Sequence, residues 1–444
     1  MFHRERKSAQ STHAKSLKDL VKMIPATQFL AEEKRQLLLK KMREFSGLEE
    51  SRYESLCAIL IENLVQYCQS LPETTNSYYS QTGGLVDHAL NRTEAALSLF
   101  KDFLLHDEPK RLSEEQKLWQ YALYTAAILQ GIGKICIDYK INLYDNNGQL
   151  LKLWNPLLEN MTQTGSCYDY DFQKEADIEF RRRLNLLLAR ELMPLSGFTW
   201  IASNPQILAI WLALLNEDQR SAGTLGAILI RADAIAIQRY FTDPLNKSAA
   251  NRNGRYGRAG TFSGGVPESL AEKEQLVGVE FIQWLMKSLD EGRIMINKAP
   301  LFMVPGGMLM SQEMFALFVR EHPEYKNWQA VQNGFLSLGL HRSFAGGVMT
   351  RFEQTQNQQM HSGVVFSEYA VALPNTVKVV QLSTGRVESM SATELIHKAQ
   401  FTHQFSQQHT VGNISSLQKL SSTGQWQSVE NETTTLSPEA RRGV

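Results

Sequence analysis

The sequence is poor in cysteine, and none of its four cysteines forms a Cys-x-x-Cys pair. Cys57 and Cys68 fall on one expected helix about three turns apart, too far for a disulfide bond, so we expect reduced thiols. Long hydrophobic runs are also missing, because the most apolar windows, such as 207–215, are far shorter than a membrane span. The basic, polar first 18 residues lack the apolar stretch of a signal peptide. These absences predict a cytoplasmic protein with no membrane partner.

An excess of charge of one sign is missing as well, because 46 Lys and Arg residues balance 46 Asp and Glu residues. Whole-molecule electrostatics therefore predict no partner, and any contact with nucleic acid has to come from local basic segments. The hydrophobic fraction of 43% and the charged fraction of 21% are ordinary for a globular protein. With 444 residues, the chain is long enough for two or three domains, each with its own core.

Helical spacing of apolar residues dominates the first half of the chain, from about residue 17 to residue 240. The pattern predicts helices over 51–71, 84–105, 113–129, 175–192, 205–215 and 224–241. Two polar stretches between these helices, 145–148 and 165–171, predict loops or a hairpin.

A stretch rich in Asn, Gly, Ser and Arg separates this half from a second folded block. That block has an amphipathic helix, short strand-like runs at 294–296 and 301–304, two more helices and a β-like piece at 348–352. This order is typical of a winged-helix-like module. We predict a mainly α protein with a disordered start (1–15), a helical domain (16–242), a basic flexible linker (243–267), a smaller winged-helix-like α+β domain (268–375) and a low-complexity, largely disordered tail (376–444).

The most informative motif is Gly83-Gly84 followed by His88, with Ile132-Gly133-Lys134 about forty residues later. This layout resembles that of HD-type metal phosphohydrolases, in which a His-Asp pair precedes the Ile-Gly-Lys turn. Here that pair is replaced by Gln130-Gly131, which supplies neither an imidazole nor a bridging carboxylate. The remaining candidate ligands are His88 and Asp233, and two ligands are too few for a tight site.

A structural interpretation stands beside the metal site. His88 and Asp233 can bond to each other or to the backbone within a helical core, and Gln130 can bond to His88 without a metal. Lys134, after a glycine turn, can hold a phosphate, although a lysine at a helix end is more often solvated. We therefore expect no cofactor, unless other ligands complete a site for Mn, Fe, Zn or Ni.

Several motifs in this order resemble the TraI-type relaxases of the MobH class, which begin conjugative DNA transfer and carry a TraI_2 domain of modified HD fold. The resemblance covers about 17–375 and rests on the segments 71–80, 83–90, 126–134, 231–233, 281–294, 304–308 and 338–342. It implies an HD-like helical domain, a C-terminal TraI domain, transfer-origin DNA as ligand, and relaxosome or type IV secretion coupling proteins as partners. The chain departs from the family at Asn76-Ser77-Tyr78-Tyr79, where the family has histidines, and at Gln130-Gly131.

Tyr78 and Tyr79 are candidate nucleophiles, because relaxases generally attack DNA with a tyrosine hydroxyl. Such an attack needs a metal to polarise the phosphate and a base to take the proton. Since the histidines are missing, a structural role for both tyrosines is the favoured interpretation. The candidate catalytic residues are thus His88, Asp233, Gln130, Lys134 and the two tyrosines.

Basic residues gather in two places that suit nucleic acid. Arg252, Arg255 and Arg258 flank Tyr256 in the linker, where arginines can follow phosphates while the ring stacks on a base. A solvated linker is the equally supported alternative. Lys326 and Arg342 flank the expected recognition helix 328–338 of the second block.

Three functions compete. The first is an active metal-dependent DNA relaxase or phosphodiesterase. The second is a relaxase-like protein that binds DNA or relaxosome partners with reduced or lost nicking activity. The third is a helical scaffold or signalling protein that does not contact DNA. The sequence favours the second, because replacements fall on the ligand positions while the packing residues around them remain.

Overall fold

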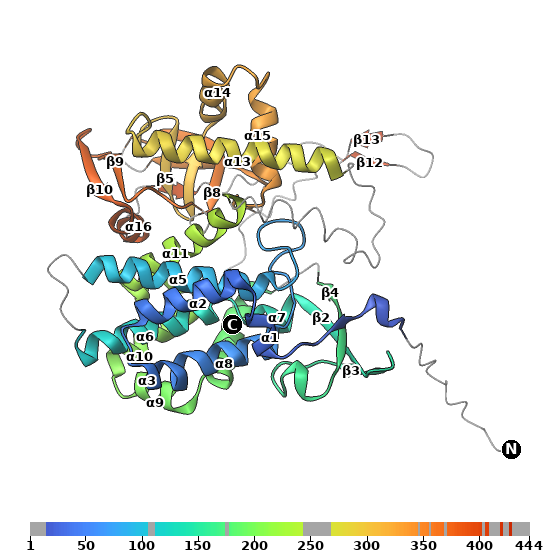
Figure 1. The fold of residues 1–444 in the computed structure, drawn as a ribbon. Helices are drawn as coiled ribbons and strands as arrows, with labels where there is room; N and C mark the ends of the chain where they lie inside the picture. Colours follow the sequence, from blue (N-terminus) through green and yellow to red (C-terminus); the bar gives the residue numbers. More distant parts are fainter. Residues whose placement is uncertain are drawn as a thin grey trace, which may run out of the picture.

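The computed structural model describes residues 15–104, 112–173, 177–242, 268–344, 347–354, 357–367 and 371–401, and three short strands at 405–407, 418–420 and 426–428. The expectations for residues 1–14, for the linker 243–267 and for most of the tail therefore lie outside the described residues. Within the described ranges, an N-terminal helical domain is followed by a smaller C-terminal domain built around a sheet (Figure 1). This confirms the predicted fold class.

Helices make up most of the N-terminal domain. Its elements are α1 (Ala26–Leu30), α2 (Glu33–Ser46), α3 (Glu50–Tyr53), α4 (Ile59–Cys68), α5 (Gly84–Leu104), α6 (Glu114–Leu129), α7 (Lys134–Ile137), α8 (Ile178–Leu192), α9 (Leu195–Ala202), α10 (Pro205–Leu215) and α11 (Gln219–Thr242), with short turns of 3-10 helix at Leu17–Asp19 and Met161–Gln163. α5 and α10 each pack against both α6 and α11, and these four helices contribute much of the domain core.

Local sequence explains where these helices begin. The Ser113 hydroxyl accepts a hydrogen bond from the backbone N–H of Gln116, and the Gln116 side-chain oxygen accepts one from the backbone N–H of Ser113. This capping box starts α6. Asn204 caps α10, and Pro205 occupies its first turn, where a missing N–H costs nothing. One turn was not predicted: Glu54–Ala58 is π-helical and joins α3 to α4.

A small antiparallel sheet lies beside the helices of this domain. It contains β1 (Val21–Lys22), β2 (Tyr139–Tyr144), β3 (Leu150–Leu153) and β4 (Cys167–Phe172) in the order β1-β4-β2-β3. The Asp145 carboxylate accepts backbone hydrogen bonds from Asn147 and Gln149, both 2.8 Å long, and so closes the turn between β2 and β3. The hairpin expected around 145–148 is therefore present.

The C-terminal domain packs three helices against a five-stranded antiparallel sheet. Its elements are α13 (Glu268–Asp290), β5 (Leu301–Val304), β6 (Gly307–Met310), α14 (Gln312–Glu321), α15 (Trp328–Ser337), β7 (Met349–Gln354), β8 (Met360–Ser367) and β11 (Phe405–Gln407), with sheet order β11-β7-β8-β6-β5. β12 (Gln418–Leu420) pairs with β13 (Trp426–Ser428). The strand expected at 294–296 is only a single bridge, from Ile296 to Val379.

The folded C-terminal domain extends beyond the boundary expected at residue 375. β9 (Thr376–Val380) and β10 (Val387–Ser391) form a hairpin, and α16 (Ala392–Phe401) follows it. Polar composition predicted a largely disordered tail from 376 onward. That boundary is too early, because Val377 and Val379 alternate with polar residues on β9 and bury their side chains in the domain core, and Leu395 on α16 is buried there too.

The two domains are tied together at several points. α16 packs on α11, where Ile396 contacts Ala227 and Ile230. On α11, Arg231 donates hydrogen bonds to the side chains of Asn375 and Thr393. Figure 1 shows α11 extending from the helical domain toward the C-terminal domain. α11 is therefore a main contact of the helical domain with the C-terminal domain.

Among the described residues, no single helix is long and apolar enough to cross a membrane. Only α9 and α10 taken together reach the required length and composition, and these two helices are bent by 116° relative to each other.

Candidate functional site

The motif residues converge on a buried cluster between α5, α11 and the loop that precedes α5. α5 carries His88 and Arg92 four residues apart, so both side chains leave the same helix face. α11 packs against α5 and presents Asp233 to that face. All three residues are buried, with exposed fractions of 3%, 6% and 8% in chain order. The predicted pairing of His88 with Asp233 is thus present in the structure.

His88 lies between two carboxylates. Its Nε2 atom is 3.1 Å from Oδ1 of Asp233, and its Nδ1 atom is 3.7 Å from Oε1 of Glu73. Because the two ring nitrogens point in different directions, the carboxylates lie on different sides of the imidazole. The imidazole thus lies between two carboxylates, and the separation from Glu73 is longer than a hydrogen bond.

Arg92 holds Asp233 from the other side. Its Nη1 atom donates a 3.0 Å hydrogen bond to Asp233, while Nε and Nη2 donate to the backbone carbonyls of Ala127 and Gln130 at 2.8 and 2.9 Å. The guanidinium therefore neutralises the buried carboxylate and also satisfies carbonyl groups at the end of α6. A buried charge with this many partners is stably held.

Glu73 has its own cation. Nζ of Lys134, at the start of α7, donates hydrogen bonds to the Glu73 side chain (2.6 Å) and to the Glu73 carbonyl (2.7 Å). The Lys134 side chain is only 13% exposed. The lysine that the sequence offered as a phosphate ligand is therefore engaged by a carboxylate of the same chain.

The charges of this cluster set the pKa values of its members. Burial alone would raise the pKa of Asp233, but His88 and Arg92 lower it below its ordinary value. Burial acts in the same way on Glu73, where Lys134 and His88 lower the pKa. For His88 burial lowers the pKa, yet Asp233 and Glu73 outweigh it and raise the pKa above 6.5. Both carboxylates are therefore held ionised.

Tyr79 and Tyr78 cover His88. The Tyr79 ring stacks on the imidazole at a centroid distance of 4.9 Å, and Tyr78 meets it edge-on at 5.5 Å. The Tyr79 hydroxyl donates to the carbonyl of Ala236 on α11 at 2.9 Å. Burial raises the pKa of both hydroxyls, and neighbouring carboxylates raise it further. This environment opposes a phenolate and fits packing.

The glycine pair of the motif allows this cover to form. A Cβ atom on Gly84 would lie 1.9 Å from the carbonyl oxygen of Tyr79, so only glycine admits the loop at this distance. The same oxygen accepts a hydrogen bond from the backbone N–H of Glu73, 2.8 Å long. Glycine is therefore required at position 84 because the backbone of the Tyr79 loop comes close to it, and this requirement involves no ligand.

The space left at the cluster is very small. A cavity of about 10 Å³ is lined by residues that include Glu73, Arg92, Gln130 and Lys134. This volume is about that of one water molecule and far below the size of small-molecule sites. Within the described part of the chain, no group of three or more His, Cys, Asp or Glu residues is arranged to hold a metal ion.

These residues do not fit the metal centre of an HD-type hydrolase. The two nitrogens of His88 face different carboxylates, so His88, Asp233 and Glu73 cannot all bind one ion without rearrangement. Arg92 and Lys134 already supply the positive charge that a metal would bring. We therefore derive no catalytic step through a metal here.

Three other polar residues near the motif do not add a ligand to the cluster. The Gln130 side-chain oxygen is buried and bonds to no described residue, so the expected Gln130–His88 contact is absent from the described residues. Asp87 pairs with Arg35 at 2.7 Å, and Asp138 pairs with Arg181 at 3.1 Å. Neither carboxylate replaces a missing ligand.

The candidate nucleic-acid residues divide into two groups. Arg252, Arg255, Tyr256 and Arg258 lie outside the described residues. Lys326 and Arg342 are exposed in loops before and after α15, and the Arg342 guanidinium lies over the Phe344 ring at 5.7 Å.

The expected recognition helix, α15, is anchored in its own domain. Val331 and Phe335 are buried in the core, while Gln329 and Asn333 are exposed. α15 packs closely on α13, because a Cβ atom on Gly278 would lie 2.2 Å from the carbonyl oxygen of Gly334.

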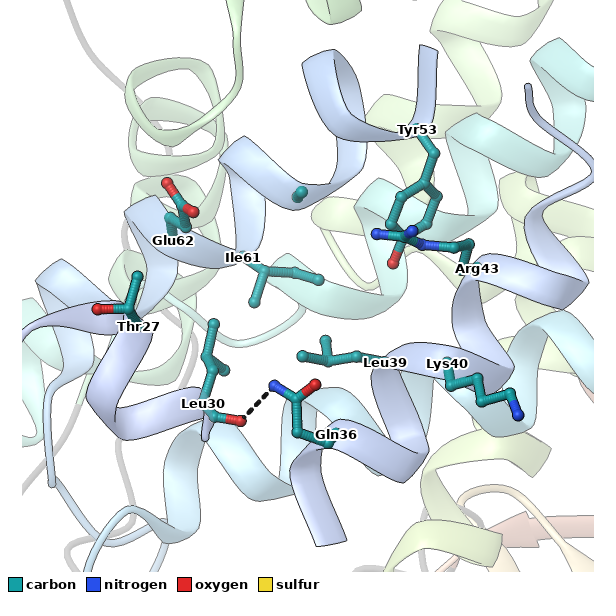
Figure 2. Close-up of a pocket in the computed structure, with 10 residues that line it drawn as sticks. Thr27, Leu30, Gln36, Leu39, Lys40, Arg43, Tyr53, Ile61 and Glu62 are labelled. Atoms are coloured by element: carbon teal, nitrogen blue, oxygen red, sulfur yellow. Dashed lines mark hydrogen bonds between the residues drawn. The ribbon is translucent and has the colours of Figure 1, made fainter. Parts of the chain in front are cut away.

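A much larger hollow lies apart from the motif. A groove of about 530 Å³ lies between the face of α2 and the wall formed by α1, α4 and the π turn, and it shares no lining residue with the cluster (Figure 2). Leu30, Leu39 and Ile61 form its apolar part, with Arg43 beside Tyr53 at one end and Glu62 toward the other. We define this feature as the α2–α4 groove.

Sequence reasoning missed two members of the cluster. Arg92 occurs four residues after His88 on an apolar helix face, and an arginine there needs a buried partner. Glu73 follows Leu71-Pro72 in a loop, where nothing in the local pattern marks it. Its role depends on Lys134, 61 residues away, and only the fold brings the two together.

Two known family models match this chain, one over the helical domain and one over the sheet domain. The TraI_2 family model, described as "Putative helicase", matches residues 20–256, which is more than half of the chain. The TraI_2_C model, described as "Putative conjugal transfer nickase/helicase TraI C-term", matches residues 276–384. No curated protein matches the sequence. The order and extent of both matches agree with the helical domain and the sheet domain. The chain therefore belongs to the family of TraI-type conjugative relaxases.

Proposed function

We propose that this chain serves conjugative DNA transfer by binding DNA or relaxosome partners, and that its nicking activity is reduced or lost. The observation that carries this proposal is the closed cluster at His88. Each carboxylate there has a cation of the same chain, and the remaining cavity holds about 10 Å³. A phosphodiester has no room in a cavity of this size.

Within the family, we assign the helical domain to a modified HD fold of the MobH class whose ligand positions have become packing positions. We assign the C-terminal domain to a winged-helix-like module that contacts DNA. Its support is the exposed pair Lys326 and Arg342 and the polar outer face of α15. The linker arginines add basic residues between the two domains.

Nicking is tested with supercoiled plasmid carrying a cognate transfer origin, incubated with the full chain and Mn²⁺, Fe²⁺, Zn²⁺ or Ni²⁺ in turn. We expect no open-circular product and no difference between the wild type and His88→Ala. Metal-dependent nicking that disappears in His88→Ala would instead establish the active relaxase. Metal analysis of chain purified without chelators gives a second readout, and we expect less than stoichiometric metal in both proteins.

DNA binding is tested by fluorescence anisotropy with labelled duplex and single-stranded DNA over a range of salt concentrations. We expect affinity to fall as salt rises, and the slope to decrease by about one for each phosphate-contacting residue removed. The test variants are Lys326→Ala and Arg342→Ala, and Lys40→Ala on the α2–α4 groove is the matched control. Absence of binding to either DNA at low salt would favour the scaffold function.

A further inference from the structure

The segment between α4 and α5 contacts both domains at once. Residues 71–83 contain no helix or strand, and their central part, 74–80, lies over the His88 cluster. We call residues 74–80 the cover loop. Figure 1 shows the segment between α4 and α5 rising from the helical domain toward the C-terminal domain. The cover loop therefore has the His88 cluster on its inner side and the C-terminal domain on its outer side.

On its inner side, the cover loop closes the cluster with two aromatic rings. Tyr79 stacks on the imidazole of His88, and Tyr78 meets it edge-on. The Tyr79 hydroxyl is bonded to α11, and its ring lies 4.9 Å from the ring of Tyr240 on the same helix. The two rings shield the imidazole, so the cover loop has to move before a reagent reaches His88 from this side.

On its outer side, the cover loop is bonded to the C-terminal domain. The Ser77 hydroxyl donates a hydrogen bond to the carbonyl of Leu338, which caps the end of α15. Gln275 on α13 donates a 3.4 Å hydrogen bond to the carbonyl of Asn76. Tyr78 packs against the hydrophobic core of the C-terminal domain. A ring that covers the imidazole is therefore also held by the other domain.

The end of α15 approaches the cover loop closely. A Cβ atom on Gly339 would lie 3.2 Å from Oγ and 3.5 Å from Cβ of Ser77. Gly339 has a φ of +69°, in the left-handed region that glycine adopts readily at the end of a helix. Because the two backbones are this close, any shift of the end of α15 relative to the helical domain changes the contact with Ser77.

The cover loop is held in a strained conformation. Tyr79 has a φ of +49°, a value that bulky residues rarely adopt. Such a conformation persists only where the surrounding structure holds it in place, and it is found mainly at ligand sites and switch regions. Loss of the outer contacts at Ser77 and Asn76 therefore removes part of what keeps Tyr79 in this conformation.

A separate contact keeps the two domains attached when the cover loop is released. α16 packs on α11, where Ile396 contacts Ala227 and Ile230, and Arg231 donates hydrogen bonds to the C-terminal domain. None of these residues belongs to the cover loop or to the end of α15. The α16–α11 contact can therefore stay in place while the end of α15 shifts.

We propose that the cover loop is a lid on the His88 cluster and that the C-terminal domain holds this lid closed. A shift of the end of α15 opens the lid, so access to His88 is controlled from the other domain. The α16–α11 contact is the fixed point of this movement. The device works in the same way whether the C-terminal domain binds DNA or a relaxosome protein.

A removable cross-link tests the proposal. In Ser77→Cys/Gly339→Cys, the two Cβ positions are 3.5 Å apart, which suits a disulfide bond. Access to His88 in the full chain is measured by its modification with diethyl pyrocarbonate and peptide mass spectrometry, with the partly exposed His322 as internal reference. We expect the oxidised double variant to react at His88 at least about fivefold more slowly than the same protein after reduction and desalting. The two single variants control for oxidation of the native cysteines.

A matched pair of glycine variants should have the opposite effect. Gly339→Ala and Gly385→Ala each add a methyl group at a left-handed position of the C-terminal domain, with φ of +69° and +68°. Only the first methyl group meets Ser77, because nothing lies within 4 Å of the second. We expect Gly339→Ala to raise His88 modification and hydrogen–deuterium exchange over residues 73–83 about fivefold, and Gly385→Ala to leave both unchanged. Exchange in α6 is the reference for an intact fold.

Three results would overturn the proposal. The first is equal reactivity of His88 in the oxidised and reduced double variant, or failure of its two new cysteines to form a disulfide bond. The second is an equal effect of the two glycine variants on His88. The third is an increase of exchange that extends equally to α6, because it would show general unfolding instead of the opening of a lid.

Discussion

The motif cluster and the α2–α4 groove lie in the same helical domain and differ in almost every physical property. The cluster holds buried, mutually paired charges beside a cavity of about 10 Å³, whereas the groove opens to about 530 Å³ and mixes leucine and isoleucine side chains with exposed charged ones. The sequence motif marks the first place and is silent about the second. The comparison shows that residues of a family motif can be kept for packing in a site whose cavity is too small for a substrate.

Charge behaves differently in the two regions. At the cluster, Arg92 and Asp233 are nearly removed from water and depend on each other. At the groove, Arg43 pairs with Glu50 and Glu54 while about half of each side chain remains in solvent. Removing a partner should therefore be costly in the first region and cheap in the second.

The largest effect is expected for Arg92→Ala. This change leaves the buried Asp233 carboxylate without its guanidinium and two carbonyls without donors, so the free energy of unfolding should fall by about 3–5 kcal/mol. Arg43→Ala, the matched change at the groove, should cost about 1 kcal/mol or less. Urea denaturation of both variants measures the difference. Equal losses would show that burial does not separate the two regions.

A smaller effect is expected for Gly84→Ala. The added methyl group meets the Tyr79 carbonyl and displaces the loop that covers His88, which should cost about 1–3 kcal/mol. Gly131→Ala is the control, because nothing lies within 4 Å of its Cβ position and only its left-handed backbone (φ +73°) is strained. That strain costs about 1 kcal/mol. A smaller loss for Gly84→Ala than for Gly131→Ala in thermal unfolding would contradict the packing role.

A pH effect is expected at His88. Its pKa is raised in the folded chain by Asp233 and Glu73, against burial and Arg92. The stabilisation is therefore complete below the unfolded pKa of about 6.5 and is lost as pH rises through the higher folded value. Urea midpoints at several pH values from about 6 to 9 should fall for the wild type and fall less for His88→Gln. Parallel curves for the two proteins would contradict this assignment.

The smallest effects are expected on the rim of the groove. Lys40→Ala and Thr27→Ala remove exposed side chains without burying or unpairing any charge, so stability should change by no more than about 0.5 kcal/mol. Thermal melting measures both variants beside Arg92→Ala. A loss above about 2 kcal/mol for either variant would show that the groove is a structural element of the core.

Much of the fold follows from local sequence. The helices expected over 113–129 and 205–215 are confirmed as α6 and α10, and Ser113 and Asn204 cap their starts. The pattern over 377–389 suggests a hairpin, and β9 and β10 form it, but the expected domain boundary at residue 375 left this hairpin and α16 in the tail because the composition there is polar. The π turn at Glu54–Ala58 has no local signal comparable to a cap.

The site was predictable in part. The motif identified His88 and Asp233, and the expected direct contact between them is present. Their counter-charges were not predicted, because Arg92 reaches Asp233 across 141 residues and Lys134 reaches Glu73 across 61. Spacing along a helix predicts which side chains share a face, but the partner on another element comes only from the fold.

The hydrogen bonds between the two domains limit which domains of different family members can be exchanged. Arg231 bonds to Asn375 and Thr393, and Ser77, in the loop that covers His88, donates a hydrogen bond to the carbonyl of Leu338. A C-terminal half inherited from another family member would have to present matching groups to α11 and to this loop. The two halves are therefore expected to be inherited together, and exchange between lineages is expected to succeed mainly for whole chains.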